Sequence, residues 1–313
     1  MRRFQSILFV TRGTVDESDA LRQALSLARS HAAALHAVVI CPLLSKDLGE
    51  YQAGFESSLA ERVRASVTKV QAALGMRPSE VLVTVEVECG DTSVDHIVRL
   101  ILRNTHDLLV KQAEPTDRET GFRALDIKLL RLCPCPVWLC RTVTPAPMTT
   151  RVAVAVNPKS IDPAARDLAL QLLQLTRSLT DRYDEELNII SCWDFAYEND
   201  LRHSPWGRAP EEIIQRNLVA AEQDHQAALQ QLIRESGIAG RVRVHNVRGS
   251  PEQAIVRFVD SLAVDILVMG TVARSGIQGF LIGNTAESVV RQIRCSLLAL
   301  KPNGFASSVR AYG

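Results

Sequence analysis

Residues 265–285 read DILVMGTVARSGIQGFLIGNT, an apolar run that leads into a glycine-rich loop. The apolar run, residues 265–269, is typical of a parallel strand that is covered on both faces. A helix is expected to begin near Asn284 and to run through Ile293. Glycines between a strand and a helix let the backbone approach a ligand closely, and the free N–H groups of the helix then face bound negative charge. The stretch therefore predicts an α/β unit with phosphate-binding chemistry at its loop.

The glycine spacing of this loop differs from that of two well-known phosphate loops. The stretch has no Gly-Lys-Ser/Thr, as a P-loop would, and no GxGxxG, as a dinucleotide-binding loop would. Taken alone the loop is a weak signal, because the same glycines would also suit a tight turn with no ligand.

The chain contains most of this arrangement twice. Residues 121–140 align with residues 283–302 without a gap, and Gly121 then corresponds to Gly283. The offset between the copies is close to half of the chain, which indicates a duplicated domain rather than a short-period repeat. At 313 residues the chain is long enough for two domains, each with its own core.

The boundary between the two domains is predicted in a segment rich in proline and threonine. This segment, residues 142–149, is typical of a short semi-rigid linker. We therefore place one domain at residues 1–143 and the other at residues 150–305.

Strands and helices are predicted to alternate in each half. The predicted strands lie near 6–11, 35–40, 81–88, 107–112 and 136–140 in the first half, and near 151–157, 187–192, 241–248, 265–270 and 296–301 in the second. This alternation predicts two tandem, doubly wound α/β domains, each with a five-stranded parallel sheet of Rossmann-like architecture. Ligands of such sheets bind beyond the carboxyl ends of the strands, where the strand order reverses. The last strands of the two halves are expected to pair, because pairing would cover two exposed edges.

The composition argues against several classes of function. With 36 basic and 35 acidic residues, the net charge of +1 lacks the footprint of nucleic-acid or membrane-surface binding. No apolar run approaches the ~20 residues of a membrane span, and the N-terminus does not resemble a secretory signal. A cytoplasmic protein is therefore expected.

The seven cysteines form an odd set without Cys-x-x-Cys spacing, and reduced, buried thiols are expected. Cys133-Pro-Cys135 leaves open a metal or redox pair, although no histidine lies nearby in the sequence. The seven histidines are scattered without metal-ligand spacing, so no metal ligands are predicted.

Each half resembles a universal stress protein domain, and the whole chain is similar to the tandem members of that family. The best match begins with VMGTVARSGI at residues 268–277. ATP-binding members carry glycine, two residues, glycine, nine residues, glycine, and then serine or threonine. The chain keeps this spacing with Gly270, Ala273 and Gly283, and Asn284 stands at the serine or threonine position. The resemblance implies a stress-response protein whose second half binds ATP or a related nucleotide as a sensor, with Mg²⁺ as an accompanying ion.

The resemblance also implies a set of ligand residues in the second half. They are Asn157, Gly270, Ala273, Arg274, Gly283, Asn284 and Thr285. Ala273 adds a methyl group where nucleotide-binding members have glycine, which would crowd the triphosphate. Asn157 stands where ATP-binding members usually carry aspartate, and it can still hydrogen-bond to ribose or adenine. Arg274 would neutralise phosphate charge.

The first half departs further from the family's pattern. Its loop is four residues shorter, because residues 110–121 correspond to residues 268–283. Gln112 and Phe122 stand where the second half has glycine and asparagine. Three acidic residues also lie in this loop: Glu114, Asp117 and Glu119. Shortening, bulk and negative charge all oppose a bound polyphosphate, so the first half is interpreted as a degenerate site, with a different ligand or a purely structural role.

Structural and functional alternatives remain open at this point. Asn284 and Glu287 fit a capping box, which would stabilise a helix with no ligand present. A nucleotide-binding sensor, a pseudo-dimeric interaction module without nucleotide, and a slow ATP hydrolase all remain candidate functions. No catalytic residue is predicted, because no Mg²⁺-holding carboxylate or base stands out. A homodimer or another protein partner is left open.

Overall fold

A computed structural model describes residues 4–115, 120–142, 150–181, 186–203, 207–271 and 282–311 of the protein. In these residues the strands form one continuous sheet in the order β3-β2-β1-β4-β5-β10-β9-β6-β7-β8. The strands are β1 Ser6–Thr11, β2 Ala34–Cys41, β3 Val83–Cys89, β4 Leu108–Gln112, β5 Val137–Cys140, β6 Val152–Ala155, β7 Leu187–Trp193, β8 Val242–Arg248, β9 Ile266–Gly270 and β10 Ser296–Leu300. Neighbouring strands are parallel except for β5 and β10.

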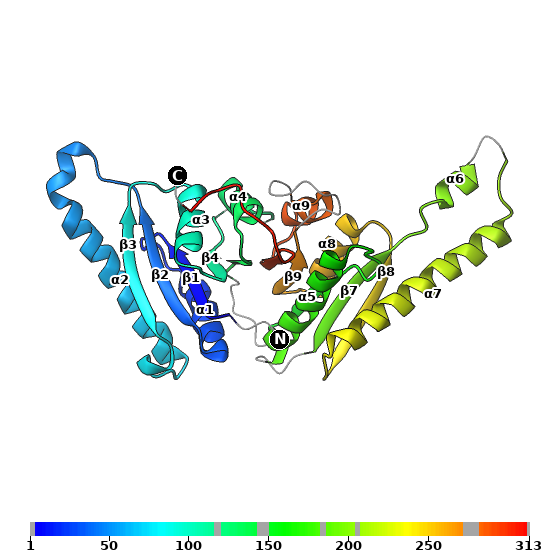
Figure 1. The fold of residues 1–313 in the computed structure, drawn as a ribbon, viewed down its shortest axis with the longest axis horizontal. Helices are drawn as coiled ribbons and strands as arrows, with labels where there is room; N and C mark the ends of the chain where they lie inside the picture. The colour runs from blue at the N-terminus through cyan, green and yellow to red at the C-terminus, as the bar shows by residue number, and fades with distance from the viewer. Residues whose placement is uncertain are drawn as a thin grey trace.

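Helices cover both faces of this sheet. They are α1 Ser18–His31, α2 Gln52–Ala73, α3 Val94–Arg103, α4 Ala124–Leu132, α5 Pro163–Asp181, α6 Glu198–His203, α7 Glu211–Ser236, α8 Pro251–Ser261 and α9 Asn284–Val290, with 3-10 turns η1 Lys46–Tyr51 and η2 Pro78–Glu80. One buried apolar cluster joins α1, α2, α5 and α7 to one face, and a second joins α3, α4, α8 and α9 to the other. Figure 1 shows the long helices α2 and α7 at opposite ends of the molecule.

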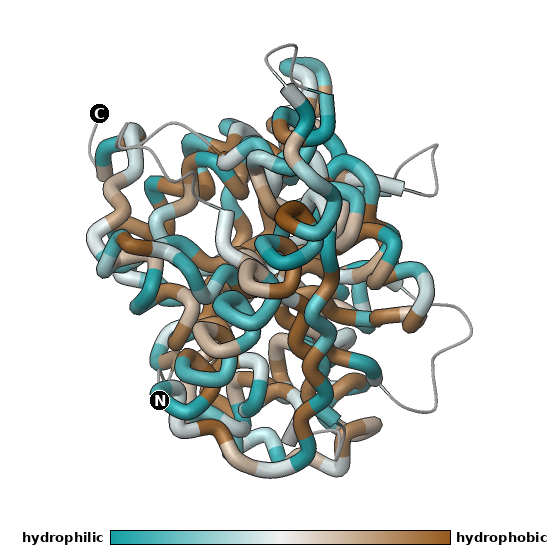
Figure 2. The backbone as a smooth tube through the Cα atoms, turned by 90° about the vertical axis from the view of Figure 1, so that its right-hand side faces the viewer, coloured by the Kyte–Doolittle hydropathy of each residue, from teal (hydrophilic) through white to brown (hydrophobic). Residues whose placement is uncertain are grey.

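The local sequence explains why these segments form strands and helices. Short apolar runs such as residues 7–10 and 266–269 are buried, as parallel strands between two helix layers require. In α1, Leu21, Leu25 and Ala28 recur at helical spacing, and all three are buried against the sheet. Hydrophobic segments accordingly run through the interior in Figure 2, while many outer turns are hydrophilic. The predicted α/β fold with largely parallel strands is confirmed.

The two halves meet at β5 and β10, as predicted from their sequences. These strands pair antiparallel, with Leu139 opposite Leu297 and Val137 opposite Ala299. The halves therefore share one sheet instead of forming two separate ones. Trp138 is fully buried at this junction, and each apolar cluster contains residues of both halves. Burial of large side chains of this kind contributes about 2 kcal/mol each.

Polar contacts also join the halves beside this junction. The guanidinium of Arg131 in α4 lies 3.0 Å from the carboxylate of Glu287 in α9. The backbone N–H of Gly121 donates a 3.0 Å hydrogen bond to the carbonyl oxygen of Ile293. The segments that contain α4 and α9 are thus fixed relative to each other by contacts that neither half makes alone.

The C-terminal segment, residues 302–311, returns to the first half after β10. Arg103 Nε in α3 donates a 2.8 Å hydrogen bond to the carbonyl oxygen of Ala311, and Val309 packs against the apolar cluster beneath α3 and α4. Lys301 Nζ lies 3.8 Å from the ring centroid of Phe305. Figure 1 shows this segment crossing toward α3 and α4.

The expectation of reduced cysteines is wrong for one pair. Cys41 and Cys89 form a disulfide. They face each other in the register of β2 and β3, with their Cα atoms 4.5 Å apart, a separation that a disulfide accommodates. The two residues are 48 positions apart in the sequence, so cysteine spacing gave no sign of the pairing.

Gly121 offers a test of the junction. Its φ is +76°, and a Cβ at this position would lie 2.4 Å from the carbonyl oxygen of Arg291. Gly121→Ala should lower the free energy of unfolding by about 2–4 kcal/mol, because the left-handed conformation and the steric overlap both carry a cost. Gly75→Ala is the matched control, since Gly75 has a φ of +58° and open space around it. The control should lose only about 1–2 kcal/mol in urea denaturation, and equal losses in the two variants would contradict the close approach.

Candidate functional site

Those predicted ligand residues of the second half that the structure describes lie where β6 and β9 end. These strands are parallel neighbours, with Ala155 opposite Met269. Asn157 follows two residues after β6 and is half-buried. Its Oδ1 accepts a 3.2 Å hydrogen bond from the backbone N–H of Lys159, so the side chain closes a short turn.

The chain before Asn157 is anchored from the neighbouring strand and helix. Ser191 Oγ on β7 donates a 3.0 Å hydrogen bond to the carbonyl oxygen of Val156. Because a hydroxyl has one proton, the 2.8 Å contact between Ser191 Oγ and His225 Nε2 requires the histidine to donate. Ser191 and His225 are both buried, and sequence reasoning did not select them.

The glycine-rich loop is closed at its base. Gly270 is the last residue of β9, and the backbone N–H of Thr271 donates to the carbonyl oxygen of Leu300 at 3.0 Å. The backbone N–H of Gly283 in turn donates to the carbonyl oxygen of Thr271 at 2.9 Å. The two ends of the loop therefore meet beside the carboxyl end of β9.

The structure brings four of the predicted ligand residues together at this point: Gly270, Gly283, Asn284 and Thr285. Asn157 lies on the adjacent strand end. Ala273 and Arg274 lie outside the described residues. Gly270 also has a packing role, because a Cβ there would lie 2.8 Å from Leu168 Cδ2 of α5.

The capping box that was left open as a structural alternative for Asn284 and Glu287 does not form at α9. The N-cap position is Gly283, which has no side chain to accept a hydrogen bond, and Asn284 is already the first helical residue. The Glu287 carboxylate instead contacts Arg291 at 2.7 Å and Arg131 of the first half at 3.0 Å. The hydrogen bond from Arg291 and the nearby charge of Arg131 hold the pKa of Glu287 below its usual range.

Glu252 is a further site residue that sequence reasoning missed. It lies in the first turn of α8, and its Oε1 accepts a 2.7 Å hydrogen bond from Thr285 Oγ1 in the first turn of α9. Its other oxygen accepts from Ser250 Oγ. These two hydroxyls hold the pKa of Glu252 below its usual range. The three residues come from segments 33 positions apart, and no local pattern joins them.

The equivalent place in the first half contains a cluster of charged side chains. Lys111 on β4 is buried, and its ammonium contacts the carbonyl oxygen of Gln112 at 2.8 Å, Glu114 Oε1 at 2.6 Å and Asp126 Oδ1 at 3.2 Å. Asp126 is fully buried in the first turn of α4, and burial raises the pKa of its carboxyl. All three N–H groups of the ammonium can thus donate hydrogen bonds to oxygens of the protein.

The cluster extends to the end of β1. Thr11 Oγ1 donates to a carboxylate oxygen of Glu17, and burial raises the pKa of Glu17. Arg12 contacts the second oxygen of Glu114 at 2.8 Å. Since β1 and β4 are parallel neighbours, the first half's own ions occupy the carboxyl ends of these two strands. Asp117 and Glu119 lie outside the described residues.

Cys133 and Cys135 are close, but no described residue joins them in a group that could hold a metal ion. Their sulfur atoms are 3.5 Å apart, and both residues are buried. Lys301 Nζ contacts the carbonyl oxygens of Arg131 at 2.9 Å and Cys133 at 2.5 Å, and burial lowers the pKa of Lys301 to about 8. Throughout the described ranges, no group of three or more His, Cys, Asp or Glu residues could hold a metal ion.

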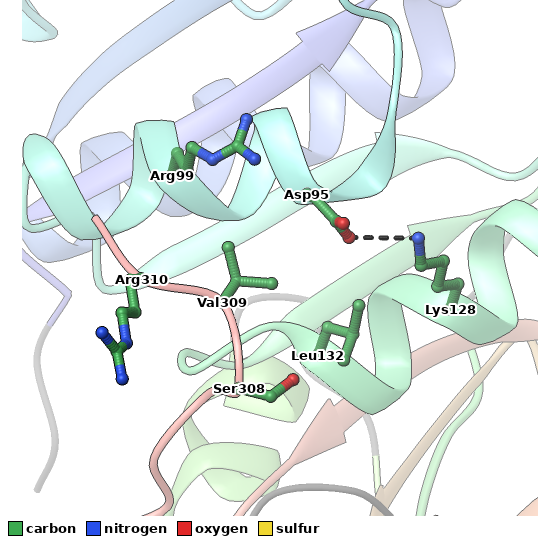
Figure 3. Close-up of a pocket in the computed structure, with 7 residues that line it drawn as sticks. All are labelled: Asp95, Arg99, Lys128, Leu132, Ser308, Val309 and Arg310. Carbon is green, nitrogen blue, oxygen red and sulfur yellow. Dashed lines mark ion pairs between the residues drawn. The ribbon is translucent and has the colours of Figure 1, made fainter. Parts of the chain in front are cut away.

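A groove of about 420 Å³ lies away from both strand-end sites, between α3, α4 and the C-terminal segment. Its lining residues are Asp95, Arg99, Lys128, Leu132, Ser308, Val309 and Arg310. Asp95 and Lys128 neutralise each other at 3.0 Å, and Arg310 turns away from this pair in Figure 3. None of the described ligand candidates lines this groove.

Comparison with known proteins places this geometry in a family. The profile of the universal stress protein family matches residues 3–141 and 148–301. Universal stress protein E of Photorhabdus laumondii is 26% identical over 325 residues, covering 99% of each chain. Universal stress protein E of Escherichia coli K12 is 27% identical over 320 residues, covering 99% of this chain and 98% of the relative.

Solved structures show the same fold. A functionally unknown protein from Pseudomonas aeruginosa PAO1 has a TM-score of 0.70 at 24% identity, covering 96% of this chain and 94% of that one. A universal stress protein from Archaeoglobus fulgidus DSM 4304 has a TM-score of 0.61 at 17% identity, covering 95% and 98%. Among the described helices, none is both long and apolar enough to cross a membrane. Because the family profile matches both halves over nearly their full length, the chain belongs to the universal stress protein family.

Proposed function

We propose that the second half binds ATP or a related nucleotide, and that the bound state is the signal of a cytoplasmic stress-response protein. The observation that carries this proposal is the 2.9 Å hydrogen bond from Gly283 to Thr271. It closes the glycine-rich loop beside the ends of β6 and β9, where ligands of open α/β sheets bind. The spacing of Gly270 and Gly283 supports the same function through its resemblance to the ATP motif of the family.

In this proposal the backbone holds the phosphates. The N–H groups of Asn284 and Thr285 lie in the first turn of α9 and have no partner inside the helix, which suits an anion. The N–H of Gly283 is not available, because it is used at the base of the loop. Arg274 would add positive charge. The Oδ1 of Asn157 is engaged with Lys159, which leaves its amide N–H groups to donate to ribose or adenine.

The first half is proposed to serve as a structural partner without a nucleotide of its own. The ammonium of Lys111 already neutralises Glu114 and Asp126 at the ends of its strands. A polyphosphate in the same place would face these carboxylates at short range. Charge repulsion therefore favours one nucleotide for each chain.

Gly283 provides a test of binding by the second half. Asp is a favoured N-cap residue, so Gly283→Asp should leave α9 folded while it places negative charge beside the phosphates. Gly283→Asn is the uncharged control of the same shape. Calorimetry with ATP should give about one site per wild-type chain and at least tenfold weaker binding for the aspartate variant than for the asparagine variant. Equal affinities of the two variants would count against this site.

Lys111 tests the role of the first half. Lys111→Met should lower the free energy of unfolding by about 3–5 kcal/mol, because it leaves Asp126 buried without its cation. Adding Asp126→Leu should recover much of that loss. Both variants should bind ATP with the wild-type stoichiometry and affinity in calorimetry. A loss of ATP binding in the folded double variant would instead assign a nucleotide to the first half.

Turnover of ATP is expected to be slower than the ordinary enzymatic rate of ~1 s⁻¹. Hydrolysis needs a group that orients the attacking water, and the nearby Glu287 carboxylate is engaged with Arg131 and Arg291. Glu287→Gln should therefore leave any residual rate unchanged. Steady-state phosphate release with Mg²⁺ measures both, and a rate above ~1 s⁻¹ that the substitution abolishes would make the protein a hydrolase.

A further inference from the structure

The disulfide between Cys41 and Cys89 lies at one edge of the sheet. In the sheet as described, β3 is the outermost strand and β2 is its neighbour, and Figure 1 shows both beside α2 at one end of the molecule. Cys41 at the end of β2 is buried, whereas Cys89 at the end of β3 is partly exposed. A small thiol or peroxide can therefore reach this end of the bond, and accessible disulfides are the ones that exchange readily.

The disulfide lies on the face of the sheet that α2 covers. Val85, Val87 and Cys89 alternate along β3, so they share one face, and all three pack against the apolar cluster beneath α2. The two valines and residues of α2 such as Ala60 line a groove of about 330 Å³. Since this groove leaves a gap between α2 and the outermost strand, the bond to β2 adds a restraint where packing is incomplete.

The second half joins the equivalent strand ends without a covalent bond. Trp193 lies opposite Arg248 at the ends of β7 and β8, as Cys41 lies opposite Cys89 at the ends of β2 and β3. In both halves the glycine after the outer strand donates a 2.8 Å hydrogen bond from its N–H to the last carbonyl of the inner strand. The guanidinium of Arg248 lies 5.8 Å from the ring centroid of Trp193, which is within the range of a cation–π contact.

The two halves also differ in how the neighbouring long helix is held. In the second half, Trp193 packs with Ile214 and Leu218 of α7 in a buried apolar cluster. In the first half, the chain that leads from β2 into α2 leaves its large apolar side chains in solvent: Leu43 is 64% exposed, Leu48 47% and Tyr51 60%. The first half thus has a disulfide where the second half has permanent noncovalent packing.

We propose that Cys41 and Cys89 are a peroxide-responsive redox switch: the oxidised pair fixes the end of β3 to β2 beneath α2, and the reduced pair releases it. This inference goes beyond nucleotide binding and takes from the proposed function only the cytoplasmic location, since that compartment keeps thiols reduced. The two thiols are then free at rest, and the bond seen in the structure forms when peroxide is present.

Hydrogen peroxide supplies the oxidising equivalents for the bond. The thiolate of Cys89 attacks one oxygen of the peroxide, the O–O bond breaks, and the released hydroxide takes up a proton to become water. The sulfenic acid left on Cys89 condenses with the thiol of Cys41, so that an S–S bond replaces the S–O bond and a second water leaves. A dithiol reductant reverses the change by exchange, and it is itself oxidised to a disulfide as both thiols return.

The first test follows the thiols of the purified full chain by mass spectrometry. The chain is equilibrated with excess reduced glutathione, then with hydrogen peroxide and finally with dithiothreitol, and is labelled with N-ethylmaleimide after denaturation. Labelling of Cys41 and Cys89 should be nearly complete in glutathione, fall by about tenfold or more in peroxide, and return with dithiothreitol. Cys295 should be labelled throughout, because burial raises the pKa of its thiol to about 12 and the thiolate is the reactive form.

Hydrogen exchange then locates the structural effect of reduction. Exchange should rise in β3 and in the first turns of α2 and stay unchanged in β7 and β8. The bond joins residues 48 positions apart, so reduction should also lower the midpoint of thermal unfolding of the first half by roughly 5–10 °C. The double variant Cys41→Ala/Cys89→Ala should behave as the reduced chain with or without peroxide. Cys192→Ala is the matched control, since it removes a free thiol beside Trp193 and should leave the response to peroxide intact.

The remaining outcomes overturn the switch. If glutathione does not reduce the folded chain, the bond is a permanent brace. If peroxide does not restore it, or if reduction leaves exchange in β3 unchanged, the pair does not act as a switch, and the same holds if reduction unfolds the whole chain. None of these measurements uses a nucleotide, so the switch and ATP binding by the second half stand or fall separately.

Discussion

The antiparallel pairing of β5 with β10 is the interaction on which the rest of the structure depends. The ladder is short, but every residue in both strands is buried. Without it, each half would expose an apolar strand edge, which favours uncontrolled association. With it, the helix layers on both faces become continuous across the molecule. The close packing of Gly121 against the end of α9 is a direct result of this pairing.

The two halves present equivalent strand-end sites with different chemistry, one at β1 and β4 and the other at β6 and β9. In the first half, buried acidic groups are satisfied by the ammonium of Lys111, and no donor of that ammonium remains unused. In the second half, the corresponding region offers backbone N–H groups, two hydroxyls and the carboxylate of Glu252. In both sites the charge of a carboxylate that is partly removed from water has to be balanced by nearby donors or cations. The first achieves it through ion pairs within the chain.

Features set by neighbouring residues were predictable from the sequence, whereas features set by distant ones were predictable only where the duplication pointed to them. The strands could be located from the sequence because a strand that is buried on both faces is a continuous apolar run. The duplication predicted the pairing of the last strands. The Cys41–Cys89 bond depends on the register between two strands, and the contact of Glu252 with Thr285 depends on how α8 packs beside α9. Glu287 fitted a local capping pattern, but Arg131 from the other half and Arg291 engage it instead. The roles of Asn157, Ala273 and Arg274 toward a ligand stay predictions.

The path of residues 302–311 has a consequence for the history of the chain. A duplicated gene begins with two interchangeable copies, and either can be lost while the other survives as a self-associating protein. Here the segment that follows the second copy packs on α3 and α4 of the first, through Arg103 and Val309. The copies are therefore no longer interchangeable, and deleting either one removes part of the other's packing. Selection then has to retain both copies, and one of them is free to lose its ligand chemistry without being lost itself.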